Sequence, residues 1–315
     1  MGKKSRQRTR AESQQQPASA DGVGPRQPCP CGSGRRYKAC HGSADGAPAT
    51  FVQRPFEGLP FEADLVALRE FVPAATAPLT LLEGDRPVLL CSLLPGASPA
   101  LVREDGTVWL GLQVQHGYGD PSRDLAAVLV KALDAEPGSI VGLADSPGEG
   151  VRLQDLVAPE PLDITVHDGF DYWVADLDDS DGSMAAALEA ANDAAAPTER
   201  LTGVEAAYWT SVGNREYLRW VLPHEEDSVL DGLARLHSAQ GESLVDGDRL
   251  IGMFRAHGLV TPVWDLPVGT GAAALEEPTV RLRAALESAI ATDAPLTSDE
   301  RAARAGLASR QLTIR

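Results

Sequence analysis

The chain has 315 residues, and 43% of them are hydrophobic, which is enough for the core of one large domain or two ordinary ones. No apolar run approaches the roughly 18 residues needed to cross a bilayer, and the amino terminus lacks the apolar segment of a signal peptide, so we expect no membrane span and a cytoplasmic protein. The formal net charge is −17, but residues 1–42 hold nine Lys and Arg against two acidic side chains, which leaves −24 for residues 43–315. This asymmetry predicts that the basic segment contacts a polyanion or an acidic surface.

Residues 1–27 are polar and basic, with Gln14-Gln15-Gln16 and several Gly and Pro. Because such a composition buries too little apolar surface to offset the entropy lost on ordering, we expect a disordered basic arm. Within the arm, Lys3–Arg10 is the one stretch from which we expect nucleic-acid binding, through the phosphates. A solubilising tail explains the same charges equally well.

Residues 28–42 read Pro-Cys-Pro-Cys-Gly-Ser-Gly-Arg-Arg-Tyr-Lys-Ala-Cys-His-Gly. Cysteines this close together beside a histidine are typical of a metal site and not of a disulfide framework. We expect Zn²⁺ to bind Cys29, Cys31, Cys40 and His41, because three thiolates and one imidazole complete its tetrahedral shell. No position is then left for a water molecule, so the predicted site is structural and not hydrolytic. Free thiols that lie together by chance are the alternative.

This predicted zinc knuckle is too short to form a hydrophobic core. Metal binding with an apparent strength of roughly 10–16 kcal/mol orders a peptide of this size by itself, so metal binding and folding are one equilibrium. Residues 43–50 are rich in Ala, Gly, Pro and Ser and are interpreted as a linker. We therefore expect a chelator to disorder residues 28–42 and to leave the melting of residues 51–315 almost unchanged.

The pattern becomes regular from Phe51 onward. A helix is predicted over 61–72, because apolar residues recur at 61, 65, 68 and 72 and Pro73 follows. Alternating apolar residues over 107–115 predict a half-buried strand, and Ser122 is expected to cap a helix that ends near residue 135. Two further strands are predicted over 79–82 and 88–94.

The second half of the body continues the mixture of strands and helices. Asp168-Gly169 is interpreted as the turn of a strand pair, and Thr297 with Glu300 as the capping box of the last helix. The remaining strands are predicted over 164–167, 170–174, 205–211, 216–222, 251–255 and 260–266, and the helices over 183–195, 225–239, 277–291 and 298–308.

Strands joined by short turns, with helices between groups of strands, predict an α+β domain over 51–315 with mainly antiparallel sheet and packed helices. The order strand, strand, helix, strand occurs around 88–144 and again around 205–266, which suggests two similar halves. Cys91 lies in a run of leucines and is interpreted as a buried core thiol.

Three histidines of the body are candidates for acid–base or metal chemistry. His224 precedes Glu225-Glu226-Asp227, although acids in a first helical turn are also what the helix dipole favours. His167 precedes Asp168-Gly169, which turn chemistry explains as well. His257 lies between two predicted strands, with Trp264-Asp265 on the second, and a hairpin turn accounts for the same residues.

Two further patterns have a structural explanation that is preferred over a functional one. Gly117-Tyr118-Gly119-Asp120-Pro121-Ser122 before a helix resembles a phosphate cradle only loosely, because Asp120 repels an anion, and a capped turn is expected. The aromatic residues Tyr208-Trp209, Trp220 and Trp264 on strands are expected in the core and not in a ligand cage.

Residues 28–42 closely resemble the SEC-C motif, which occurs at the carboxyl end of the preprotein translocase ATPase and on many other proteins. The resemblance places Cys29, Cys31, Cys40 and His41 on the zinc ligands of the motif. It implies docking on a protein or ribonucleoprotein partner, with the export chaperone and the ribosome as candidates. The chain has no Gly-x-x-x-x-Gly-Lys-Ser/Thr phosphate loop, so the ATPase activity is not implied.

The body resembles an actinobacterial family of unknown function whose members carry the same knuckle, and this resemblance implies no activity. It rests on Arg54–Pro60, Leu68–Thr76, Ala206–Trp209, Phe254–Leu266 and Asp293–Thr297.

Two functions are expected from the sequence. The first is a zinc-binding adaptor of the cytoplasm that docks through its knuckle and basic arm on a large partner such as the translation or export machinery. The second is an enzyme of unknown reaction whose site lies in the body, at His257 or the His224 group, with the knuckle as a targeting tag. The adaptor is preferred.

Overall fold

The computed structural model describes Gln27, Arg36, Tyr37 and residues 51–115, 118–143, 150–174 and 185–312. The chain divides into two compact units, Met1–Phe51 and Val52–Arg315. Most of the predicted arm, knuckle and linker therefore lies outside the described residues, and the fold below is that of the second unit. This unit is an α+β structure with two sheets, mainly antiparallel, which confirms the predicted fold class.

The first sheet has six strands, and β2 and β4 form its one parallel pair among the described residues. Strand β3 comes between β2 and β4 in the chain. It pairs antiparallel with β4, and β4 in turn lies beside β2 and runs parallel to it. In spatial order the strands are β5 (Ile140–Val141), β3 (Ala100–Val102), β4 (Val108–Gly111), β2 (Val88–Cys91), β1 (Ala75–Leu79) and β6 (Thr165–Val166).

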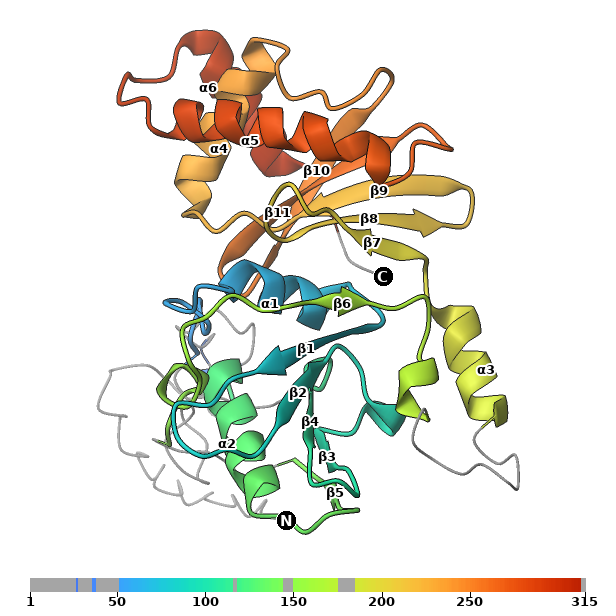
Figure 1. Cartoon of the computed structure of the whole chain (residues 1–315). Coiled ribbons are helices and arrows are strands. Elements are labelled where there is room, and N and C mark those ends of the chain that lie inside the picture. The colour runs from blue at the N-terminus through green and yellow to red at the C-terminus, as the bar shows by residue number, and fades with distance from the viewer. Residues whose placement is uncertain are drawn as a thin grey trace, which may run out of the picture. The chain divides into compact units, whose positions relative to one another are not determined.

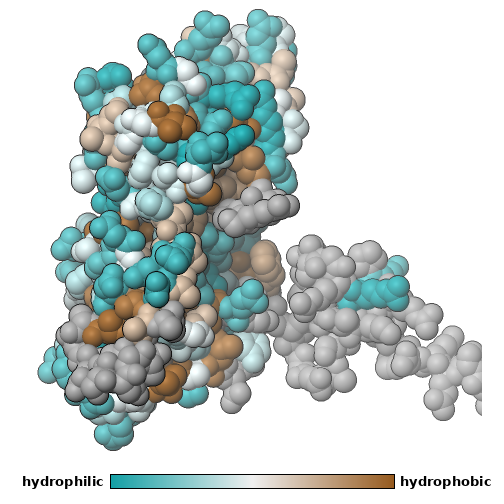
Figure 2. Space-filling model, turned by 90° about the vertical axis from the view of Figure 1, so that its right-hand side faces the viewer, coloured by the Kyte–Doolittle hydropathy of each residue, from teal (hydrophilic) through white to brown (hydrophobic). Residues whose placement is uncertain are grey.

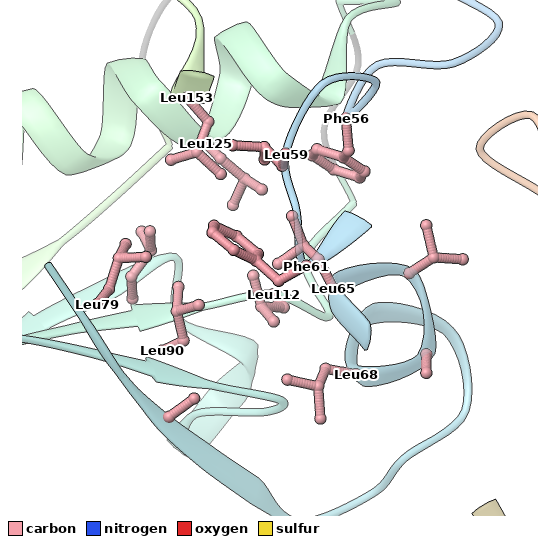
Figure 3. Packing of buried hydrophobic residues seen from close by; sticks show 14 of the residues in the cluster. Phe56, Leu59, Phe61, Leu65, Leu68, Leu79, Leu90, Leu112, Leu125 and Leu153 are labelled. Carbon is pink, nitrogen blue, oxygen red and sulfur yellow. The ribbon is translucent and has the colours of Figure 1, made fainter. Parts of the chain in front are cut away.

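Two helices pack on one face of this sheet, α1 (Glu62–Glu70) and α2 (Pro121–Leu133). Figure 3 shows how Leu65 and Leu68 of α1 and Leu125 of α2 meet Leu90 of β2 in one apolar cluster. The burial of every second strand residue against this cluster is what amphipathic strands and helices require.

The opposite face of the six-stranded sheet is covered by aromatic side chains. Trp109 of β4 packs against Tyr172 and Trp173, which lie in a short 3₁₀ helix (Asp171–Trp173). The Tyr172 hydroxyl and the Trp173 indole both donate to the carbonyl of Leu93, at 3.1 Å each. All four residues of β4 are consequently buried. A strand does lie within the predicted range 107–115, but it is buried on both faces and not half-buried as predicted.

Three local predictions need correction. The segment 170–174 is not a strand, because its aromatic residues form the 3₁₀ helix and only β6 pairs with β1. The strand predicted over 79–82 overlaps β1 only at Leu79. Residues 75–78 were not predicted as a strand, because Pro73 and Pro78 weaken the strand signal there. Asp120, and not Ser122, caps α2, because its carboxylate accepts the backbone amide of Ser122 at 3.2 Å.

The second sheet is antiparallel throughout, and helices α4 (Glu226–Ser238), α5 (Glu276–Ile290) and α6 (Ser298–Ser309) cover one of its faces (Figure 1). Helix α3 (Ala185–Ala194) precedes the sheet in the chain, where a helix was predicted. In spatial order the strands are β10 (Arg249–Ala256), β11 (Leu259–Leu266), β9 (Arg215–Trp220), β8 (Ala207–Val212) and β7 (Thr198–Arg200).

Both faces of this five-stranded sheet are buried. On β11, Val260 and Trp264 join the cluster beneath α4, α5 and α6, whereas Leu259 and Val263 join the cluster that contains α1. Figure 1 accordingly shows α1 between the two sheets. The predicted helices over 225–239, 277–291 and 298–308 are confirmed, as is the capping box, in which Thr297 and Glu300 bond each other's backbone amides.

Candidate functional site

Two of the three residues described in the knuckle region, Gln27 and Tyr37, are joined by a backbone hydrogen bond. The amide of Tyr37 donates to the carbonyl of Gln27 at 2.8 Å, and the Tyr37 ring is 7% exposed. Gln27 comes two residues before Cys29, and Tyr37 comes three residues before Cys40. In the sequence, Cys29 and Cys31 lie between these two bonded residues, and Cys40 and His41 follow Tyr37. The four expected ligands themselves lie outside the described residues.

The body contains an open hollow of about 440 Å³ at the carboxyl end of the β2–β4 pair. Its walls come from two elements: the last turn of α1 contributes Arg69 and Glu70, and the segment that follows β4 contributes Gln113, Val114 and Gln115. Four of these five residues carry polar or charged side chains, so the hollow suits a polar ligand better than an apolar one.

The Arg69 guanidinium is buried behind this hollow, with 9% of the side chain exposed. Its Nη1 donates to the carbonyl of Leu112 at 2.5 Å, and its Nη2 donates to the carbonyl of Val114 at 3.1 Å. Burial lowers the pKa of Arg69, and the charges of Glu70 and Asp124 oppose this shift only in part. Arg69 thus ties α1 to the segment after β4.

His257 sits at the tip of the hairpin between β10 and β11. His257 and Gly258 both have positive φ, at 49° and 83°, as a two-residue turn of type I′ requires, so the predicted hairpin turn is confirmed. A side chain at position 258 would clash, because a Cβ there would lie 2.7 Å from the Cβ of Arg54. The turn therefore holds the His257 ring against the start of the body.

The His257 ring reaches α1 through Nε2, which lies 2.8 Å from Oε1 of Glu70 and 3.2 Å from Nε of Arg69. One ring nitrogen cannot donate to the carboxylate and accept from the guanidinium at once. The shorter, charge-assisted contact prevails, so Nε2–H donates to Glu70. Burial raises the pKa of Glu70, but the hydrogen bond and charge of His257 and the charge of Arg69 outweigh it and leave that pKa below its usual value.

A buried carboxylate that the sequence analysis missed lies in the first turn of α2. Asp124 is 3% exposed, and neither of its oxygens has a hydrogen-bond partner within the described part of the chain. Burial and the charge of Asp120 raise the pKa of Asp124 to about 6, while the charge of Arg69 and the backbone amide of Tyr118, which is near but not in hydrogen-bond geometry, oppose the shift. An Asp at this helix position looks like ordinary dipole stabilisation, so no sequence signal marks it.

The acids after His224 do not converge on a common centre. Glu225 binds Arg54 at 2.7 Å, Glu226 binds Arg255 at 2.6 Å, and Asp227 binds Arg304 at 2.6 Å. Each carboxylate forms an ion pair with an arginine from a different part of the fold. This group holds elements together, and it presents no acid–base constellation.

His167 is engaged in the aromatic cover of the first sheet. Its Nε2 lies 2.9 Å from the hydroxyl of Thr76, and its ring stacks on Tyr172 with 4.6 Å between centroids. Burial lowers the pKa of His167, against the opposing charge of Asp168. The ring therefore has a packing role.

The structural explanations preferred for Asp120 and for the aromatic residues on the strands agree with the structure. Asp120 caps α2 and binds Arg123 at 3.2 Å and Arg152 at 3.4 Å, so it is not part of a phosphate cradle, and Gly117 lies outside the described residues. Tyr208, Trp220 and Trp264 are buried, whereas Trp209 is half-buried and donates to Glu216 at 2.8 Å. Asp265 lies 3.7 Å from Arg249.

No group of three or more His, Cys, Asp or Glu suited to a metal ion occurs in the described ranges. None of the helices described here has the length and apolar character to span a membrane. On the face shown in Figure 2, hydrophobic side chains are scattered among hydrophilic ones.

Comparisons with known proteins define the chain in two steps. A SEC-C motif matches residues 26–43, so the chain carries this motif ahead of a larger body. Residues 55–315 match the family of unknown function DUF5926, and the chain belongs to that family. These matches confirm both resemblances inferred from the sequence, to the SEC-C motif and to a family of unknown function. Searches of the curated proteins and of the solved structures found no match.

Proposed function

We propose that this protein is a zinc-binding adaptor that docks on a large partner through residues 1–42. The SEC-C motif over residues 26–43 is the observation that carries this proposal. Three thiolates and one imidazole, from Cys29, Cys31, Cys40 and His41, are a donor set that suits Zn²⁺ and closes its shell. A zinc ion with four protein ligands has no open position for a substrate, so its role is structural. The function then lies in the protein surface that the bound zinc orders.

Charge supports the choice of partner. Residues 1–42 have a net charge of +7 and residues 43–315 a net charge of −24. Such a chain presents its basic end to an acidic or polyanionic surface while its body is repelled by the same surface. We propose a protein or ribonucleoprotein of the cytoplasm, with the ribosome and the export chaperone as the candidates, and nucleic-acid contact through Lys3–Arg10 only.

Co-sedimentation with purified ribosomes and pull-down with the purified export chaperone test the proposal. The full chain is compared with a chain lacking residues 1–45, a chain lacking residues 1–27, and the Cys40→Ser variant. We expect binding to be lost without residues 1–45 and to weaken steeply as salt rises from 50 to 300 mM. Cys40→Ser separates the knuckle from the arm, since it leaves every basic residue in place. Binding to neither partner, or binding that survives removal of residues 1–45, rejects the adaptor.

A second candidate is an enzyme with its site in the body. The contact of 2.8 Å between His257 and Glu70 favours it, because an imidazole oriented by a carboxylate is a general acid–base pair. Against it, Nε2 is held between Glu70 and Arg69, and the ring packs edge-on against Phe56 with 5.3 Å between centroids. The residues that line the hollow do not include His257. We therefore prefer binding over catalysis for this part of the body.

Incubation of the full chain with a metabolite extract, followed by mass spectrometry, tests the enzyme. Turnover that is present in the natural chain and absent in His257→Asn supports catalysis. Equal metabolite profiles for the two chains reject it.

A further inference from the structure

The hollow beside α1 is lined by two acceptor oxygens that have no partner among the described residues, one on Gln113 and one on Glu70. Gln113 shows this most clearly, because its amide nitrogen donates to two backbone carbonyls, those of Leu68 at 2.9 Å and Val72 at 2.7 Å. Two carbonyl partners demand the NH₂ group, so the orientation of the Gln113 amide is determined. Its Oε1 accepts no hydrogen bond from any described residue.

The cation in the wall is largely buried, and two of its three nitrogens are bound by backbone carbonyls. The two terminal nitrogens of Arg69 donate to the carbonyls of Leu112 and Val114, and its Nε faces His257. A guanidinium held by backbone carbonyls on one side is poorly placed to receive an anion from the other. Asp124 lies close enough for its charge to act on Arg69, which offsets the positive charge further.

Glu70 supplies a negative charge with one free oxygen. Its Oε1 accepts the proton of His257, while no hydrogen bond to its Oε2 occurs within the described part of the chain. The side chain is 30% exposed, and Glu70 lines the hollow together with Gln113. Because the pKa of Glu70 lies below its usual value, this carboxylate is ionised at neutral pH.

We propose that the hollow binds a small primary ammonium ligand, a linear alkylamine or diamine, through Oε2 of Glu70 and Oε1 of Gln113. A primary ammonium group has three N–H donors and a positive charge, which match one ionised and one neutral acceptor. A volume of about 440 Å³ lies within the range of small-molecule sites, roughly 300–1,000 Å³. The net charge of −24 over residues 43–315 also attracts a cation.

This inference does not depend on the adaptor proposal. It concerns only residues of the body, and it survives if residues 1–42 have no partner. Conversely, failure to bind an amine leaves the SEC-C docking proposal untouched.

Calorimetric titration of the full chain with 1,4-diaminobutane is the test. Two ligands of similar length serve as controls, the uncharged 1,4-butanediol and the anionic succinate. We expect saturable binding of the diamine and none of the diol or succinate at the same concentration. Equal binding of the diol shows a non-specific hollow, and preferential binding of succinate shows that Arg69 dominates the site. Either result overturns the proposal.

Glu70→Gln removes the charge and keeps the shape, so we expect diamine binding to weaken at least about tenfold, as the loss of a charge-assisted hydrogen bond implies. Glu287→Gln on α5 is the matched control, because Glu287 is exposed on the opposite side of the five-stranded sheet. Unchanged affinity in Glu70→Gln contradicts the site.

A measurement on the natural chain keeps the proposal testable if Glu70→Gln fails to fold. The side-chain amide resonances of Gln113 and Gln115 should shift on addition of diamine, while those of Gln240, which lies beyond the carboxyl end of α4, should not. Diamine that binds without a shift at Gln113 overturns the assignment to this hollow.

Discussion

The proposed zinc knuckle and the body of this protein differ in what their sequences offer for stability. Residues 28–42 offer one tyrosine and no other large apolar side chain, so the proposed metal carries nearly all of their folding free energy. The described part of residues 52–315 buries two large apolar clusters and a small aromatic one, which supply its stability. If zinc binds as proposed, the contrast teaches that one chain can combine a part ordered by a metal ion with a part ordered by its apolar core.

The largest effect is expected in the knuckle. Cys40→Ser removes one of four ligands, and we expect zinc content to fall from one ion per chain to well below one, since apparent metal binding of roughly 10–16 kcal/mol orders such a segment. Elemental analysis of purified protein measures the metal. The melting temperature of the body, followed by near-ultraviolet circular dichroism, should stay the same.

Cys91→Ser provides the control for this experiment, because Cys91 is a buried thiol of the body and no expected ligand. It should keep the zinc and lower the melting temperature of the body. A large fall in the body's melting temperature on chelation of the natural chain would instead mean that the two parts are not independent.

A smaller effect is expected from the polar contact that links α1 to the five-stranded sheet. Asp64 accepts the hydroxyl of Tyr208 at 2.8 Å and Nη2 of Arg200 at 3.0 Å. Asp64→Ala leaves the guanidinium and the buried hydroxyl without this partner, so we expect a loss of about 3–5 kcal/mol in the free energy of unfolding. Urea denaturation of the body measures it, with the zinc content unchanged.

Tyr208→Phe is the matched variant, because it removes only the hydroxyl and retains the ion pair. A cost of about 1 kcal/mol is expected. Equal costs for Tyr208→Phe and Asp64→Ala would show that the ion pair with Arg200 contributes nothing.

An effect smaller than that of Asp64→Ala depends on pH. Because the pKa of Asp124 is raised to about 6, the folded state binds this proton more tightly than the unfolded state. Its contribution to stability is complete below about pH 4 and is lost as pH rises through about 6, by roughly 2–3 kcal/mol in all. We expect Asp124→Asn to melt higher than the natural chain at pH 7.5 and at about the same temperature at pH 4.

Asp85→Asn, an exposed substitution, should follow the natural chain at every pH. Melting curves of Asp124→Asn that run parallel to those of the natural chain between pH 4 and pH 8 refute the assignment of this pH dependence to Asp124.

Most helices and strands could be predicted from the sequence, because their residue patterns repeat locally, with the period of a helix or of a strand. The helix over 61–72 and the hairpins on either side of α4 followed from spacing and turn residues. Strands β3 and β7 were missed, since three residues give no period to read. The segment after β6 was predicted as a strand because aromatic residues favour strands. In the structure, Tyr172 and Trp173 instead lie in a 3₁₀ helix and pack against Trp109.

The hollow was less accessible, because it joins residues that are distant in the sequence. His257 was a candidate, but Glu70 and Arg69 were interpreted only as part of a helix. The contact between Glu70 and His257 spans 187 positions and depends on how α1 lies between the sheets. The expected zinc ligands are the opposite case, since their spacing within one short segment carries the prediction.

A sheet buried on both sides leaves evolution little room to vary its faces. Seven of the eight residues of β11 are buried, so almost any substitution there disturbs one of two packed layers. New chemistry in such a body must arise at its margins: the hairpin tips, the helix ends and the segments that leave the strands. A deep mutational scan should therefore show an intolerant central stripe flanked by permissive turns, with His257-Gly258 as the turn that resists change.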